Sequence, residues 1–103
     1  MADADKIWAH RLRQARTAVG ISQRQLGIDA GIDEFVASSR INRYEQGVHE
    51  PDYLTAKNLA KALGVSAAFL YAAEDDVADL IFLYGHAKPA DKQKIKKFIS
   101  GFA

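Results

Sequence analysis

The chain has 103 residues, 49% hydrophobic and 26% charged, a composition that predicts one small globular domain with a modest core. The absence of cysteine excludes disulfides, thiolate metal sites and cysteine nucleophiles, and no apolar run approaches the roughly 20 residues that span a membrane. The formal net charge is +1, a smaller excess than nucleic-acid-binding domains often carry.

A first helix is predicted over residues 6–19, after a tail at residues 1–5 that is expected to fray. Apolar side chains recur along it every three or four residues, which indicates one buried face, and Gly20 can end it. The apolar positions are Trp8, Leu12, Ala15 and Val19.

A second helix is predicted directly after Ser22. Ser22 and Gln25 have the spacing of a capping box, in which the serine hydroxyl accepts from the third amide and the glutamine reaches back. Leu26 and Ala30 form its apolar side, and Gly31 supplies the positive-φ residue that ends it.

The next helix ends at Gly47 and has faces of different chemistry. Ala37, Ile41 and Tyr44 are spaced four and then three residues apart, which indicates a buried face. Six side chains on its other faces can form hydrogen bonds, and the charged ones among these six are positive, which suits base edges and phosphates. The residues expected to bind DNA on this helix are Ser38, Ser39, Arg40, Asn42, Arg43 and Gln46.

Two more helices are predicted after a loop that contains Pro51. Asp52 can cap the first and Gly64 can end it, while Ser66 can cap the second. Apolar spacing again gives each helix a buried face. The apolar positions are Leu54, Leu59, Ala60 and Leu63, then Phe69 and Leu70.

Residues 76–103 predict two amphipathic helices, and Pro89 suits the first position of the second. Their apolar stripes exceed what one monomer covers easily, and such a patch usually marks an interface. We expect this extension to pair two copies of the chain, while docking back onto the first and fifth helices stays open. The expected dimer-interface residues are Val77, Leu80, Ile81, Tyr84, Ile95 and Phe98.

Charge is sorted along the chain, so the small net charge hides local fields. All basic residues within 12–47 are arginines, acids cluster at 74–79, and lysines gather at 88–97. The lysine run is typical of a solvated helix face, with an additional phosphate or membrane-surface contact as the alternative. The three histidines lack ligand spacing, and no nucleophile lies near a base, so no metal site, cofactor or catalytic residue is predicted.

Several of these positions together resemble the helix-turn-helix of phage repressor and Cro proteins, also called the XRE type. The resemblance covers residues 12–71 and keeps its register across three helices. The stretch before Gly47 is longer than in the family, with extra residues around 33–36 that either extend a helix or form a loop. The matching positions are Ser22, Gln23, Leu26, Ala30, Gly31, Ile41, Arg43, Glu45 and Gly47.

The resemblance implies an all-α fold, with a five-helix helix-turn-helix DNA-binding domain at residues 6–73 and a helical extension at 76–103. It implies a sequence-specific transcriptional regulator in a bacterial or phage cytoplasm, a repressor that binds a palindromic operator as a homodimer. The alternative is an antitoxin-type module that neutralises a protein partner through its extension and regulates its own synthesis. An enzyme and a membrane partner are not expected.

The resemblance also implies roles for single residues. Gln23 is expected to contact a backbone phosphate and to brace the recognition helix. Arg43 and Asn42 suit guanine and adenine, each through two hydrogen bonds, while Arg40 and Gln46 suit phosphates. For each of these side chains, a solvated helix surface is the alternative.

The resemblance further pairs Arg16 with Glu45, which would tie the first helix to the end of the recognition helix. A guanidinium and a carboxylate can meet through two parallel hydrogen bonds, and two solvated charges are the alternative. Asp33 and Glu34 are expected to place favourable charge at a helix N-terminus, with acceptance from cytosine as the sharper alternative.

Overall fold

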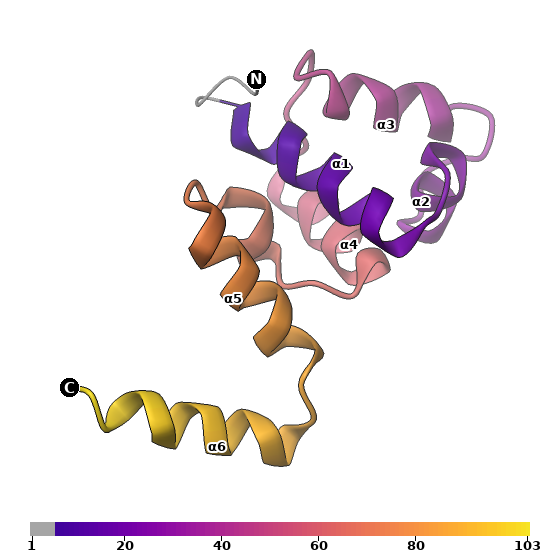
Figure 1. Cartoon of the computed structure of the whole chain (residues 1–103). Helices are drawn as coiled ribbons and strands as arrows, with labels where there is room; N and C mark the ends of the chain where they lie inside the picture. The colour runs from indigo at the N-terminus through magenta and orange to yellow at the C-terminus, as the bar shows by residue number, and fades with distance from the viewer. Residues whose placement is uncertain (1–5) are drawn as a thin grey trace.

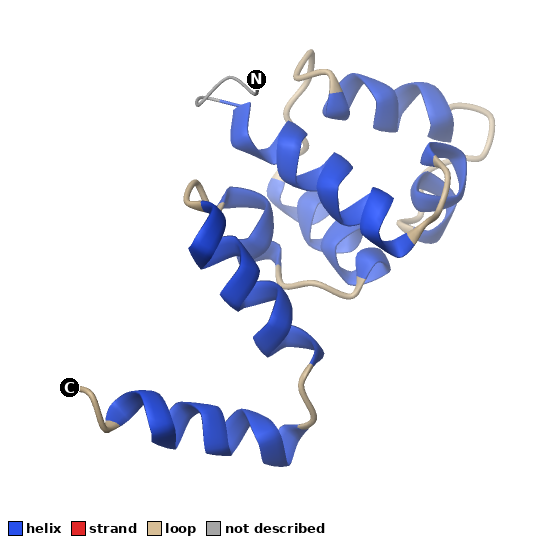
Figure 2. Ribbon diagram, viewed as in Figure 1, coloured by secondary structure: helices blue, strands red, loops and turns tan. Residues whose placement is uncertain are grey.

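The computed structural model describes residues 6–103, so the tail expected at residues 1–5 lies outside the described part of the chain. Between these residues the chain forms helices and loops and no strand, which confirms the all-α fold (Figure 2). In chain order the helices are α1 (Ile7–Val19), α2 (Gln23–Asp29), α3 (Ala37–Glu45), α4 (Tyr53–Leu63), the 3₁₀ helix η2 (Ala67–Tyr71), α5 (Asp75–His86) and α6 (Pro89–Ser100).

The first five of these helices enclose one core, with α1 lying across the bundle (Figure 1). Each contributes a side chain that is at most 1% exposed, and each of these side chains stood on a predicted apolar face. Burial of one large aliphatic side chain contributes about 1.5–3 kcal/mol, so each of these side chains contributes substantially to the stability of the bundle. These side chains are Leu12, Leu26, Ile41, Leu59 and Leu70.

Two local expectations were wrong. Val19 and Leu54, expected on buried faces, are 44% and 64% exposed, because each lies in a terminal turn that the neighbouring helices do not cover. The fifth helix is a 3₁₀ helix of five residues, a form common in short connecting segments. Its cap is as predicted, since the Ser66 Oγ accepts from the amide of Ala68 at 3.2 Å.

The capping box before α2 is only half formed. The Ser22 Oγ accepts from the Gln25 amide at 3.0 Å, as predicted. The Gln25 side chain does not reach back, because its Nε2 donates forward to the Asp29 Oδ1 at 2.7 Å. The glycines predicted to end helices all have positive φ, namely Gly20, Gly31, Gly47 and Gly64.

Arg11 is a fully buried arginine that the helical spacing did not single out. Its Nε donates to the carbonyl of Ala72 at 2.8 Å, and its Nη2 lies 3.1 Å from the Asp75 Oδ1. A second bond from Nη2 reaches the carbonyl of Ala73 at 3.3 Å. These contacts bind the segment between η2 and α5 to α1, and so they set the direction in which α5 leaves the core.

The extension consists of α5, which packs on the bundle, and α6, which does not. On α5, Ala78 is fully buried and the Phe82 ring packs on Phe69, with centroids 5.9 Å apart. No residue of α6 is buried, and this helix runs away from the bundle, giving a molecule of 49 × 27 × 23 Å (Figure 1). Between α5 and α6 lies an open, mostly apolar hollow of about 420 Å³, whose lining includes Leu80, Ile81, Tyr84, Ile95 and Ile99.

Candidate nucleic-acid interface

The start of α3 is held tightly against α2. A Cβ atom added to Gly27 would lie 2.6 Å from the Cβ of Ala37, so the two helices cross at a distance that only glycine permits here. Ala37 is the first residue of α3 and is fully buried. The first turn of α3 therefore has a fixed position relative to α2.

The end of α3 is held by the ion pair predicted from the sequence. The Arg16 Nε donates to the Glu45 Oε2 at 2.6 Å, and its Nη2 donates to Oε1 at 3.0 Å. The Glu45 side chain is 2% exposed and that of Arg16 18%. The hydrogen bond to Glu45 raises the pKa of the Arg16 guanidinium, burial opposes this, and Coulomb attraction adds to it. The two-bond geometry joins α1 rigidly to α3.

Gln23, the first residue of α2, bridges to two residues of α3. Its Nε2 donates to the Asn42 Oδ1 at 3.2 Å and to the Glu45 Oε1 at 3.1 Å. The expected bracing contact is therefore present in the geometry. The same contact engages the Asn42 oxygen, which is the atom that would accept from an adenine amino group.

The face of α3 opposite its buried residues is open to solvent. All six residues of α3 and its C-cap that were expected to bind DNA are exposed, while Gln23 on α2 is partly buried. The six residues and Gln23 thus lie on one side of the bundle. The exposed six are Ser38, Ser39, Arg40, Asn42, Arg43 and Gln46.

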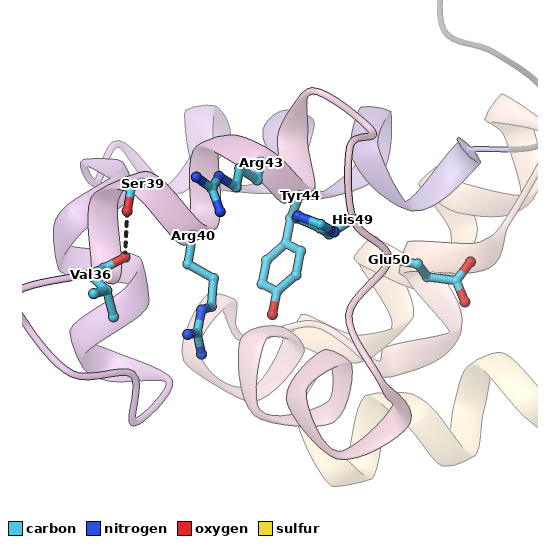
Figure 3. Close-up of a pocket in the computed structure, with 7 residues that line it drawn as sticks. All are labelled: Val36, Ser39, Arg40, Arg43, Tyr44, His49 and Glu50. Carbon is cyan, nitrogen blue, oxygen red and sulfur yellow. Dashed lines mark hydrogen bonds between the residues drawn. The ribbon is translucent and has the colours of Figure 1, made fainter.

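A shallow hollow of about 440 Å³ lies along this face (Figure 3). In that view Arg40 extends on the same side of α3 as the ring of Tyr44, and Arg43 points along the helix toward Ser39. The residues expected to bind DNA did not include four residues of the lining, Val36, Tyr44, His49 and Glu50. Gly47 was the available signal for the last two, because its positive φ of 73° turns the chain back beside α3.

The extra residues before α3 form a loop and do not extend either helix. The Asp33 Oδ1 accepts from the Phe35 amide at 2.8 Å, and the Asp33 carbonyl accepts from Val36 at 3.1 Å. Glu34 lies 3.2 Å from the Arg24 Nη2, so this acid pairs with α2. Since α3 begins at Ala37 with no side-chain cap, neither following serine starts the helix.

Two further findings concern the part of the chain that the structure describes. None of its helices combines the length and apolar character that a membrane crossing requires. Between residues 6 and 103, histidine, aspartate and glutamate side chains form no group that could hold a metal ion.

Comparison with known proteins places these features in context. A helix-turn-helix family model (HTH_3) matches residues 12–70, the range that begins within α1 and ends within η2. Among solved structures, the chain is similar to the crystal structure of the transcriptional regulator BswR, with 42% sequence identity and a TM-score of 0.83. That match covers 90% of this chain and 92% of the other, so it includes most of the extension. No curated protein matches the chain.

Proposed function

Because the chain belongs to the helix-turn-helix family of the XRE type and is a DNA-binding transcription regulator, we propose that it acts as a homodimeric repressor on a palindromic operator. The observation that carries this proposal is the form of α3. The helix is held at both ends by buried contacts, and it presents an open face of hydrogen-bonding and positively charged side chains.

In this proposal α3 is the recognition helix. Helices of this class enter the major groove with their N-terminal residues against base edges, while the preceding helix crosses the backbone. Arg43 is then placed to read guanine through two hydrogen bonds, and Arg40 and Gln46 to contact phosphates. Ser38 and Ser39 stand in the first turn of α3, where the helix approaches the bases.

The extension supplies the second recognition helix by pairing two chains. One α3 of nine residues buries too little surface for a specific site, so two copies at a fixed separation are needed. The hollow between α5 and α6 contains four of the six residues expected in the interface, Leu80, Ile81, Tyr84 and Ile95. Val77 and Phe98, the other two, are 43% and 70% exposed. We propose that residues 6–73 bind DNA and residues 76–103 form the dimer.

Repression would result from occupation of the operator by the dimer. A dimer bound across a promoter in the bacterial cytoplasm would exclude polymerase, and this needs no catalytic group and no cofactor. The DNA-contacting residues would be Gln23 together with the six exposed residues of the α3 face.

Selection of binding sites from random duplex DNA tests this function. We expect enrichment of a pseudo-palindrome with half-sites one helical turn apart, about 34 Å. Arg43→Ala is the matched control, because it alters the open face and leaves the buried contacts of α3 in place. Enrichment of single, unrepeated sites would contradict the dimer. Failure to enrich any site, with a second protein co-purifying at equal stoichiometry, would favour the antitoxin-type alternative.

A further inference from the structure

Phe35 is exposed to an unusual degree for a phenylalanine. It is 90% exposed, more than any other large hydrophobic residue within residues 6–103. Its neighbour Val36 is also exposed, at 40%, so the loop before α3 ends in an apolar tip. A single exposed apolar side chain needs no explanation by itself, but the position and construction of this one point to a ligand.

The loop that carries Phe35 is fixed by contacts at several points. The Asp33 carboxylate accepts from the Phe35 amide at 2.8 Å, which sets the backbone direction at Phe35 itself. Glu34 is held to Arg24 of α2 at 3.2 Å, and the chain then enters α3 at the close crossing of Gly27 with Ala37. Both acids of the loop are thus engaged in holding it, and they leave Phe35 as the group that projects.

The tip borders the candidate DNA-binding face. Val36, which follows Phe35 directly, lines the same hollow as Ser39, Arg40 and Arg43 (Figure 3). Phe35 also lies two residues before the start of α3, at the end of the helix that approaches base edges in this class. If α3 occupies the major groove, a side chain at that end lies close to the base edges.

One polar side chain at this end of α3 is already engaged. The Ser39 hydroxyl donates to the carbonyl of Val36 at 3.1 Å and so is bound to its own backbone. The tip therefore offers apolar surface where the first base contact is expected. The major groove has one apolar feature among the four bases, the 5-methyl group of thymine.

We propose that Phe35 contacts the 5-methyl group of a thymine in each half-site and selects thymine at that position. The inference rests on the proposed function, because it assumes that α3 occupies the major groove. Phenylalanine side chains that are inserted between base pairs act from the minor groove, so that mode does not fit this location.

The test compares thymine with uracil, which differs only by the methyl group. Starting from the selected site, deoxyuridine replaces thymidine at one position of each half-site in turn, and affinity is measured for the intact chain and for Phe35→Ala. We expect the intact chain to lose about fourfold in affinity per half-site at one position, the contribution of one buried methyl group. The Phe35→Ala variant should bind the thymine and uracil duplexes equally.

The control is Leu54→Ala, which removes another exposed large apolar side chain, 64% exposed and located on α4, outside the extension. This variant should keep the full preference for thymine. If Phe35→Ala keeps that preference, or if it weakens binding to every duplex alike, the inference is overturned while the proposed function stands. If no site can be selected with the intact chain, the proposed function itself fails.

Discussion

Asn42 and Arg43 are adjacent on α3, yet their side chains have different freedom. The Asn42 oxygen accepts a hydrogen bond from Gln23 at 3.2 Å, so base reading by Asn42 competes with the bracing of α3. Arg43 lines the open hollow and can extend toward a ligand. Among the candidate contacts, Arg43 is therefore the side chain on which discrimination between bases should depend most.

Arg43→Ala should reduce affinity for the operator by about 1–3 kcal/mol and relax the preference at one base pair. Gln23→Ala should instead weaken binding to all sequences alike, because it loosens the position of the whole recognition helix. Titration of the operator, its single-base variants and random DNA distinguishes the two effects. An equal loss on operator and random DNA after Arg43→Ala would show that Arg43 contacts only phosphate.

Glu45 carries a buried charge whose partner is Arg16. Arg16→Met should lower the free energy of unfolding by about 3–5 kcal/mol, because it leaves that carboxylate without its counter-charge. The double variant Arg16→Met with Glu45→Leu should recover much of the loss, since no unpaired charge remains. Urea unfolding of the natural chain, the single variant and the double variant measures these differences in unfolding free energy. If the double variant is as unstable as the single one, then the loss comes from packing and not from charge.

At the scale of the element, Asp52 gives α4 a cap that depends on pH. Its carboxylate accepts from the Thr55 amide at 2.8 Å, and the hydrogen bonds of Thr55 lower the pKa of this carboxyl below its usual 3.8. A lowered pKa stabilises the fold fully above pH 3.8 and ceases to do so as pH falls through the lowered value.

Asp52→Asn should retain a cap that cannot titrate, because asparagine also accepts from the backbone at this position. We expect the variant to show a weaker fall in unfolding free energy below pH 3.8 than the natural chain. Thermal unfolding between pH 7 and pH 2 measures the difference. Identical pH profiles for the two proteins would show that Asp52 contributes nothing to acid sensitivity.

Apolar spacing and glycine positions were sufficient to predict most helices, because both act within a few residues of one another. Contacts between elements that are distant in the sequence were harder to predict. Arg11 looks like a surface residue until α1 is packed against the segment at Ala72. The Gln25 side chain could accept from the Ser22 amide or donate to the Asp29 carboxylate, and spacing could not decide between the two.

The candidate site divides in the same way. The Arg16–Glu45 pair was predicted only because the chain resembles a known family. No local sequence pattern indicates that residues 29 positions apart are in contact. The loop at residues 31–36 could not be predicted, since acids there suit a helix start as well as a turn. The conformation of this loop depends on the contact of Glu34 with Arg24 and on the close approach of α2 to α3.

At the scale of the whole molecule, α6 is the unusual feature. It is a helix of twelve residues with no buried side chain, and isolated helices of that length are marginal in water. The rings of Phe98 and Phe102 pack edge to face with centroids 5.2 Å apart, and both side chains remain exposed. A second copy of the chain would supply the apolar cover that this helix lacks.

Phe98→Asp should yield a folded monomer with greatly weakened operator binding. The substitution disrupts no core, because Phe98 is 70% exposed. Leu54→Asp is the matched control, since Leu54 is 64% exposed but lies on α4, outside the extension. Sedimentation measures the oligomeric state, and titration of the operator measures the affinity. A Phe98→Asp variant that stays dimeric would place the interface elsewhere, most simply around η2.

The buried and exposed residues of α3 form separate sets, and this has an evolutionary consequence. Ala37, Ile41, Tyr44 and Glu45 hold the helix in place, whereas the residues proposed to contact DNA are exposed. Exposed substitutions usually change stability by less than about 0.5 kcal/mol. A duplicated gene could therefore acquire a new regulatory target through a few exchanges on one face, without passing through unstable intermediates.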